Sequence, residues 1–214
     1  EYYVACISIG RHKTTVSMYD LAGNPIISSV ESISGLSSEE SLIKLSKKVN
    51  EFVKSSEKRV LGVGISCEGM INEKEGICVF SANLSWENVP VKDIVERETA
   101  LPSFVDNDVK VIALGEKWFG QAKDINDFVL FYTGYGLGVS VMTNDGLYRG
   151  SENYASEFGH TVIDPVNGPE CSCGNKGCLQ AYASGSALLR DLKHRYETEP
   201  SIYDIIKDIC GGTK

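Results

Sequence analysis

Residues 2–30 read YYVACISIGRHKTTVSMYDLAGNPIISSV, and this stretch indicates how the fold begins. Apolar, β-prone runs at residues 2–9 and 14–19 are separated by Gly10 and a short basic segment. The turn signal DLAGN then precedes a third run at residues 25–30. The pattern predicts three consecutive strands joined by short turns.

A similar arrangement returns in residues 127–143, which read DFVLFYTGYGLGVSVMT. One apolar run ends at Gly134, a second covers residues 138–143, and the next residues, Asn-Asp-Gly, predict a turn. The repeated order of strand, glycine, strand and turn predicts two related lobes that each open with a β-meander. Apolar strands broken by glycine are also common without any duplication.

Strands and helices alternate between and after these two stretches. Ser37 and Glu40 fit a capping box, and Leu42, Leu45 and Val49 then recur at helical spacing. Further segments are a strand at 60–66, a helix at 91–99, a strand at 103–106, a helix at 107–119, and helices at 186–196 and 201–210. We expect an N-terminal α/β lobe over residues 1–123 and the start of a second over 124–214.

Composition limits the classes of protein to which the chain can belong. Its 214 residues are 42% hydrophobic, which is enough to form a buried core. The net charge of −8 disfavours binding to nucleic-acid phosphates. No apolar run reaches membrane-spanning length and no signal segment is visible, so we expect a cytoplasmic protein without membrane contact. Seven cysteines, an odd number, argue against a secreted disulfide framework.

Four of the potential metal ligands have a recognisable spacing: His160, Cys171, Cys173 and Cys178. Three cysteines and one histidine fill the four positions of a structural Zn²⁺ site and leave none for a reactive water. The glycines at 174 and 177 allow the loop to turn tightly. Structural zinc is therefore predicted, with three buried thiols and an unrelated histidine as the alternative.

Carboxylates and amides gather at another point. Asp106, Asn107 and Asp108 lie where a predicted strand gives way to a helix, the junction at which α/β sheets bind ligands. Asp108 in the first helical turn could accept a proton from a hydroxyl, whereas an N-cap role for the pair is the alternative. Asn83, in a polar loop at 81–84, and Glu157, three residues before His160, extend the set of residues suited to a polyol.

Two glycine-containing loops could hold an anion through backbone N–H groups. The loop at 133–138 contains Gly134 and Gly136, and the equivalent turn at 8–13 has one glycine and no carboxylate. The alternative for the loop at 133–138 is a plain glycine hairpin, which is more common than a phosphate site.

Together these motifs resemble the ROK family of repressors, open reading frames and kinases. The resemblance is carried by EFGH at 157–160, CSCGNKGC at 171–178, Asn107-Asp108 and the glycine loop at 133–138, and ALGEKWFG at 113–120 is similar to the xylose-repressor branch. It extends from about residue 4 to the end of the chain. It implies a two-lobed α/β ATPase fold of the actin/hexokinase-like (ribonuclease H-like) type, with the second lobe incomplete.

The resemblance also implies a monosaccharide bound between the lobes. The positions that match the family's sugar contacts are Gly69, Asn83, Asn107, Asp108, Glu157 and His160, and Gln180 stands where the family has Glu. Asp108 matches the general base of the kinase members, and Gly134 and Gly136 match the nucleotide loop. His160 would be both zinc ligand and sugar contact.

Several positions depart from the kinase pattern. Ser8 replaces an Asp in the first phosphate loop, Arg11 and His12 replace small residues, and Glu68 replaces Pro. Because phosphoryl transfer depends on positioned phosphates and metal, we expect ATP and Mg²⁺ to bind poorly. The chain is predicted to be the sugar-sensing portion of a repressor. DNA would be bound only through a helix-turn-helix outside this chain, and a homodimer is expected. An ATP-dependent sugar kinase and a ligand-free zinc domain are the alternatives.

Overall fold

The computed structural model describes residues 2–144, 146–151, 153–155 and 157–193, and the predicted helix at 201–210 lies outside them. The chain divides into two compact units. The first comprises Glu1–Phe128 and Met142–Ala155, and the second comprises Val129–Val141 and Ser156–Lys214. The division at residue 123 that the sequence suggests stays a prediction.

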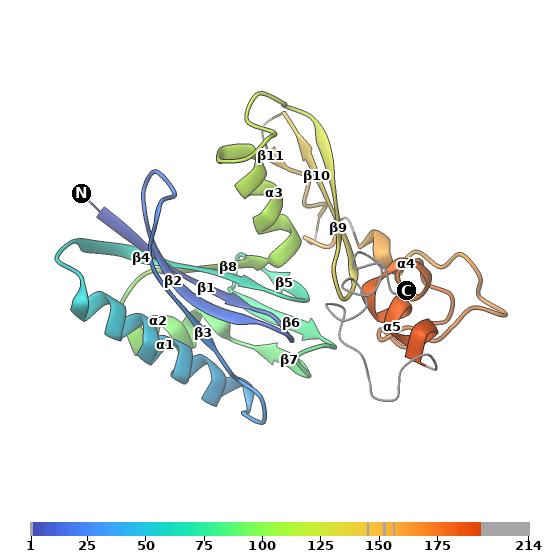
Figure 1. Cartoon of the computed structure of the whole chain (residues 1–214), viewed down its shortest axis with the longest axis horizontal. Coiled ribbons are helices and arrows are strands. Elements are labelled where there is room, and N and C mark those ends of the chain that lie inside the picture. Colours follow the sequence, from blue (N-terminus) through green and yellow to red (C-terminus); the bar gives the residue numbers. More distant parts are fainter. Residues whose placement is uncertain (1, 145, 152, 156, 194–214) are drawn as a thin grey trace, which may run out of the picture. The chain divides into compact units, whose positions relative to one another are not determined.

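A five-stranded sheet with the order β3-β2-β1-β4-β8 forms the centre of the first unit (Figure 1). Its strands are β1 (Tyr2–Ile9), β2 (Thr14–Asp20), β3 (Pro25–Glu31), β4 (Arg59–Cys67) and β8 (Ser103–Asn107). The first three pair as the predicted antiparallel meander, and β1, β4 and β8 run parallel. The parallel strands bring the carboxyl ends of β1, β4 and β8 to the same edge of the sheet.

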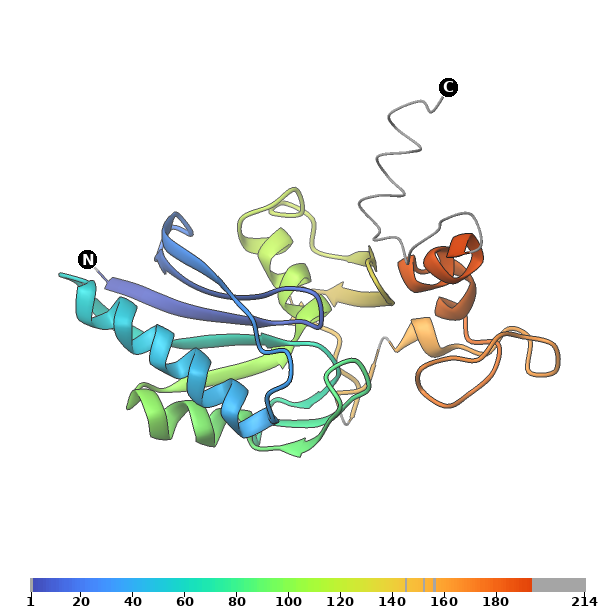
Figure 2. The same cartoon turned by 60° about the horizontal axis from the view of Figure 1, so that its bottom comes forward.

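Helices α1 (Ser38–Ser55) and α2 (Val91–Thr99) pack against each other on one face of this sheet (Figures 1 and 2). The predicted capping box is confirmed, because the Ser37 hydroxyl accepts from the Glu40 N–H and the Glu40 carboxylate accepts from the Ser37 N–H. Leu42, Leu45 and Val49 are fully buried against the sheet in the main hydrophobic core. The helical spacing therefore identified the buried face correctly.

A small antiparallel sheet, absent from the sequence prediction, follows β4. Its strands are β5 (Met70–Asn72), β6 (Ile77–Ser81) and β7 (Trp86–Val89), in the order β5-β6-β7. Short strands give weak periodicity, and the turns between them use positive φ angles at Gly76 and Ser85. The expected polar loop at 81–84 starts one residue later, because Ser81 closes β6 and is buried.

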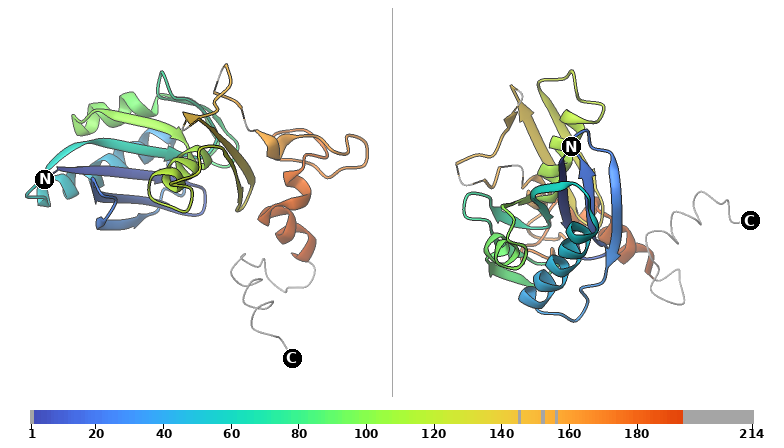
Figure 3. Two further views of the ribbon diagram at one scale, coloured as in Figure 1. Left: turned by 90° about the horizontal axis from the view of Figure 1, so that it is seen from above. Right: turned by 90° about the vertical axis from the view of Figure 1, so that its left-hand side faces the viewer.

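Helix α3 (Asp108–Trp118) follows β8 directly. It begins one residue later than predicted, because Asn107 is its N-cap. The remaining elements are β9 (Phe128–Thr133), β10 (Leu137–Thr143), β11 (Gly146–Leu147), a 3-10 turn (Phe158–His160), α4 (Gln180–Ala183) and α5 (Gly185–Leu192). The irregular segment before α4, and the two helices after it, can be followed in Figure 3. No helix in the described part of the chain is long and apolar enough to cross a membrane.

Two buried serines on α1 allow a matched test of the packing. Ser46 is fully buried, and within the described residues its hydroxyl has no hydrogen-bond partner. Since an unpaired buried hydroxyl is costly and Ala favours helix, Ser46→Ala should raise the free energy of unfolding by about 0.5–1.5 kcal/mol. Denaturant unfolding monitored by circular dichroism measures this.

The control is Ser41→Ala, because Ser41 is equally buried but its hydroxyl donates to the Ser37 carbonyl at 2.7 Å. Ser41→Ala should gain no stability. A Ser46→Ala chain less stable than the wild type would contradict the packing described here.

Candidate functional site

A polar cluster lies where β4 and β8 end. The register of these parallel strands places Cys67 opposite Asn107, so the residues that follow each strand are neighbours. The Asn107 Nδ2 group donates to the Gly69 carbonyl at 3.0 Å. Gly69 has a φ of 116°, and a Cβ there would lie 2.4 Å from the Phe80 carbonyl oxygen. Only glycine fits this approach, which brings the β6 end into the cluster.

Asn83 joins the same cluster through Glu68. Its Nδ2 group donates to the Glu68 carboxylate at 3.3 Å, and Glu68 directly precedes Gly69. Three predicted contacts, Gly69, Asn83 and Asn107, therefore belong to one connected group in the first unit, and Asp108 directly follows Asn107 in the chain. Their contact with a sugar stays a prediction.

Asn107 and Asp108 have different structural positions. The Asn107 Oδ1 atom accepts from the backbone N–H groups of Val109 and Lys110 at 3.0 and 3.2 Å, so the N-cap interpretation holds for Asn107. Asp108 is half-buried in the first turn of α3, where the positive end of the helix dipole favours a carboxylate. The proposed role of Asp108 as a base requires such an ionised group.

Lys110 is a member of this region that the sequence analysis missed. Its side chain is only 4% exposed, and its Nζ group donates to both the backbone carbonyl and Oδ1 of Asn153. The Asn153 Nδ2 group donates to the Ile71 carbonyl at 2.8 Å. These bonds fix the segment around Asn153 onto α3 and β5. The contact spans 43 residues, so local sequence patterns give no sign of it.

Arg149 belongs to the same network and pairs with Asp106. Its guanidinium donates to Asn153 Oδ1 at 3.0 Å and to the Asp106 carboxylate at 2.7 Å. The hydrogen bond that Arg149 donates to Asp106 raises the pKa of Arg149, although partial burial opposes the shift. The other Asp106 oxygen accepts from the Asn107 N–H at 2.8 Å. Asp106 therefore supports the residue that caps α3.

The second unit holds the four predicted metal ligands together. One donor atom from each of His160, Cys171, Cys173 and Cys178 lies within 4.8 Å of all the others. The Cys173 and Cys178 sulfurs are 3.7 Å apart, and the Cys171 sulfur is 3.6 Å from His160 Nδ1. A tetrahedral centre with metal–sulfur bonds of about 2.3 Å separates its sulfurs by about 3.8 Å. The cluster therefore has the dimensions to hold a metal ion.

The loop that carries the cysteines depends on glycine. Gly177 has a φ of 68°, and a Cβ there would lie 1.8 Å from the Asp164 carbonyl oxygen. Gly168 lies against the same oxygen, and a Cβ at Gly168 would be 2.3 Å from it. Gly174 has a φ of 90° and its N–H donates to the Cys171 carbonyl at 3.0 Å. The tight turns predicted for 174 and 177 are confirmed.

The thiols of this cluster differ in acidity. Burial raises the pKa of Cys178 to about 12, with hydrogen bonds to Cys173 and Cys171 adding to the shift. Burial also opposes ionisation of Cys171, yet hydrogen bonds from Cys173 and Gln180 lower its pKa to about 6. The Gln180 amide donates to the Cys171 sulfur at 3.3 Å. Gln180 therefore contacts a predicted metal ligand, and its own predicted sugar contact stays a prediction.

Glu157 and His160 occupy one turn, as their spacing predicts. The His160 N–H donates to the Glu157 carbonyl at 3.1 Å, and the 3-10 turn between them places Glu157 at the surface. The turn is packed closely, because a Cβ at Gly159 would lie 2.1 Å from the Leu137 carbonyl oxygen. The position of His160 is thus set both by this turn and by its contact with Cys171.

The glycine loop between β9 and β10 uses its backbone internally. The Gly134 N–H donates to the Gly136 carbonyl at 3.0 Å. The carbonyls of Gly134 and Tyr135 accept from the N–H groups of Gly185 and Ser186, at the start of α5, at 2.8 and 3.0 Å. The Gly134 N–H is therefore engaged within the loop and is not available to an anion.

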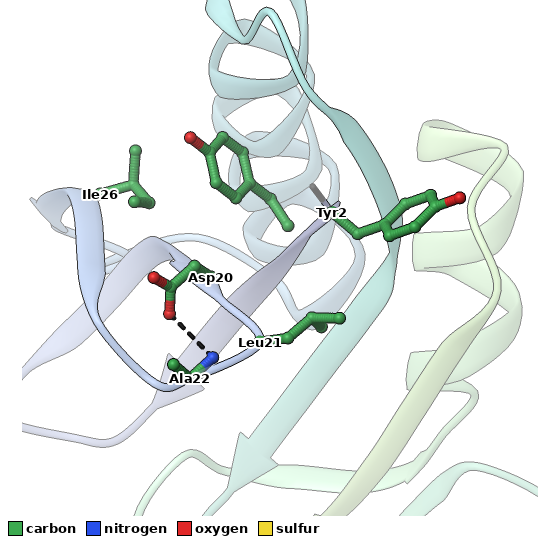
Figure 4. Close-up of a pocket in the computed structure, with 6 residues that line it drawn as sticks. Tyr2, Asp20, Leu21, Ala22 and Ile26 are labelled. Carbon is green, nitrogen blue, oxygen red and sulfur yellow. Dashed lines mark hydrogen bonds between the residues drawn. The ribbon is translucent and has the colours of Figure 1, made fainter.

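An open pocket of about 340 Å³ lies elsewhere, beside the start of β1 and the turn after β2 (Figure 4). Its lining residues are Tyr2, Tyr3, Asp20, Leu21, Ala22 and Ile26. The Asp20 carboxylate is engaged in its own turn, accepting from the N–H groups of Ala22 and Asn24. Since ligands of α/β sheets bind at the carboxyl ends of parallel strands, we assign the candidate site to the polar cluster instead.

The chain belongs to the ROK family, whose family model matches residues 4–212. A ROK family transcriptional regulator, a homologue of the Escherichia coli MLC protein, is similar in structure with a TM-score of 0.85 and 28% identity, over 99% of this chain and 56% of the regulator. A ROK family glucokinase from Streptomyces griseus, in complex with glucose and AMPPNP, gives a TM-score of 0.88 and 27% identity, over 98% of this chain and 72% of the enzyme. The predicted actin/hexokinase-like α/β fold is therefore confirmed.

Relatives in sequence include both repressors and kinases. A xylose repressor from Caldicellulosiruptor bescii is 41% identical over 136 residues, which are 64% of this chain and 34% of the repressor. A glucokinase from Thermotoga maritima is 40% identical over 136 residues, 63% of this chain and 43% of the enzyme. The matched segments therefore span less than half of the length of these two relatives.

Lys110→Met tests the buried network beside the cluster. The change keeps the length of the side chain but leaves two buried Asn153 oxygens without the ammonium donor, so the free energy of unfolding should fall by about 2–4 kcal/mol. Denaturant unfolding measures the loss. Lys47→Met on the exposed side of α1 is the control and should change stability by less than about 0.5 kcal/mol. Equal stability of the two variants would show that Lys110 is not part of a network that supports the fold.

Proposed function

We propose that this chain is the monosaccharide-binding part of a ROK-family transcriptional regulator and that it does not transfer phosphate. The observation that carries the proposal is the connected group of Gly69, Asn83 and Asn107 where β4 and β8 end, with Asp108 next to it in the chain. Amides and carboxylates pair well with sugar hydroxyls, which both donate and accept hydrogen bonds. The predicted roles of Glu157, His160 and Gln180 as further contacts belong to the same proposal.

The turn between β1 and β2 argues against phosphoryl transfer. Residues 8–13 contain no carboxylate, and the Ser8 hydroxyl lies 3.4 Å from that of Ser66. Kinase chemistry requires a metal ion held at the β- and γ-phosphates, usually through a carboxylate or hydroxyl placed for it. In the second predicted phosphate loop, the Gly134 N–H donates to the Gly136 carbonyl and is therefore not available to a phosphate.

The relatives named as repressors support a regulatory role. In a regulator of this kind, sugar binding would shift the population of conformations and so alter DNA binding by another part of the longer protein. The net charge of −8 disfavours contact between this portion and DNA phosphates. Assembly as a homodimer and a cytoplasmic location remain predictions.

A sugar kinase is the second candidate, and a specific observation favours it. Asn107 and Asp108 are both present, and Asp108 opens α3 where a base could meet a ligand hydroxyl. The 40% identity to a glucokinase extends over the same proportion of the chain as the identity to a repressor. Phosphate transfer in this chain would then depend on Asp108.

The metal cluster is proposed to hold one structural Zn²⁺. Three thiolates and one imidazole nitrogen are a donor set that structural zinc takes, and the ligand spacing fits it. When bound, the ion would cross-link the 3-10 turn at His160 to the cysteine loop. The chain's own contribution is to hold the His160 ring and the Cys171 sulfur in place, partly through the Gln180 amide.

Calorimetry with a panel of neutral pentoses and hexoses tests the sugar proposal. At least one sugar should bind with a dissociation constant in about the micromolar to millimolar range. Asn83→Ala should weaken binding about tenfold, because it removes an amide from the cluster. Asn50→Ala, whose amide donates to the Glu98 carbonyl on the helical face, should bind like the wild type.

A coupled assay of ADP release separates the two candidates. No turnover is expected with any sugar that binds. ATP-dependent turnover that is abolished in Asp108→Asn would establish the kinase instead. Absence of heat from every sugar would count against both functions and favour a domain without a sugar ligand.

Removal of zinc should destabilise the chain. Because the binding energy of structural zinc is also folding energy, a chelator should lower the melting temperature by at least about 5 °C, and added Zn²⁺ should restore it. Elemental analysis should find about one zinc per chain, lost in Cys173→Ser but retained in Cys6→Ser, which lies outside the cluster. A zinc-free chain that is unaffected by chelator would refute the site.

A further inference from the structure

One carboxylate joins the end of β1 to the candidate site. Glu68 follows β4, and its N–H donates to the Ile9 carbonyl at 3.2 Å, so it lies beside the last residue of β1. One oxygen of its carboxylate accepts from the Arg11 backbone N–H at 3.3 Å. The other accepts from the Asn83 Nδ2 group at 3.3 Å. The side chain therefore bridges the β1–β2 turn and a predicted sugar contact.

The turn is shaped to receive this carboxylate closely. A Cβ at Gly10 would lie 2.9 Å from the Glu68 Oε1 atom, so even alanine would require the carboxylate to shift. The residues that follow, Arg11, His12 and Lys13, make the turn basic. A backbone N–H in a basic turn attracts an anion, and here the chain supplies one from its own sequence.

We propose that Glu68 is a resident anion that makes the candidate site select uncharged sugars and reject phosphorylated ligands. The proposal rests on the sugar-binding function proposed above and specifies the ligand class of that site. A phosphate group that approached the turn would compete with Glu68 for the Arg11 N–H and would meet a like charge. Juxtaposed like charges are an effective means of excluding a ligand.

The second Glu68 contact sets the orientation of the Asn83 amide. Because the Asn83 Nδ2 group donates to Glu68, the amide is oriented with that donor engaged. The second Nδ2 hydrogen can still donate, and the Oδ1 atom accepts, which suits a ligand group that carries a hydrogen. Sugar hydroxyls carry one, whereas the oxygens of a phosphate dianion do not. Asn83 can therefore both donate to and accept from a hydroxyl, and the charge of Glu68 is the feature that would exclude a phosphate group.

Glu68→Gln in the full chain tests the proposal, because it removes the charge and keeps the shape. Isothermal titration calorimetry with inorganic pyrophosphate and with glucose 6-phosphate should show negligible binding to the wild type. Glu68→Gln should bind at least one of these probes at least about tenfold more tightly than the wild type does. The control is Glu87→Gln, which removes the same charge from an exposed position on β7 and should behave like the wild type.

Three outcomes would overturn the proposal. Wild-type binding of either phosphate probe as tightly as Glu68→Gln would show that Glu68 excludes nothing. Rejection of both probes by Glu68→Gln would show that another group is the barrier, and an equal gain in Glu87→Gln would indicate a general charge effect. Pyrophosphate binding is measured without sugar, so failure of the sugar panel would refute the proposed function without changing this result.

Discussion

The side-chain amide of Asn107 makes the interaction on which the rest of the candidate site depends. Its oxygen caps α3, and its nitrogen holds the Gly69 carbonyl after β4. One amide thus joins the end of one parallel strand, the start of a helix and the turn into the small sheet. Both ends of the amide are engaged within the chain, so Asn107 holds its neighbours in position. This structural role is compatible with its predicted contact with a ligand. Asp108 acquires its place at the start of α3 from this cap.

Sequence patterns were most informative where structure is local. The meander at the start of the chain and the buried stripe of α1 were predicted because period-2 and helical spacing are properties of adjacent residues. The proximity of His160, Cys171, Cys173 and Cys178 is predicted for a similar reason, since the three cysteines lie within eight positions and His160 is eleven residues before the first of them. Here local geometry alone brings the ligands together.

Contacts between distant segments were missed. The sheet of β5, β6 and β7 has strands of three to five residues, too short for a clear alternation. Lys110 meets Asn153 across 43 residues, and neither residue type is typical of a core. Glu68 was noticed as an unusual residue, but its bridge from Arg11 to Asn83 depends on the parallel pairing of β1 with β4. Such contacts follow from tertiary structure, which pattern reasoning does not supply.

The crowded glycines of the loop that carries the cysteines limit how its sequence can change. Gly168 and Gly177 lie back to back, and a Cβ on either would meet the Asp164 carbonyl oxygen. Any missense change in these two codons adds a side chain where none fits. The loop therefore has no gradual route of decay through these positions, because the first substitution already disrupts the backbone that holds the cysteines.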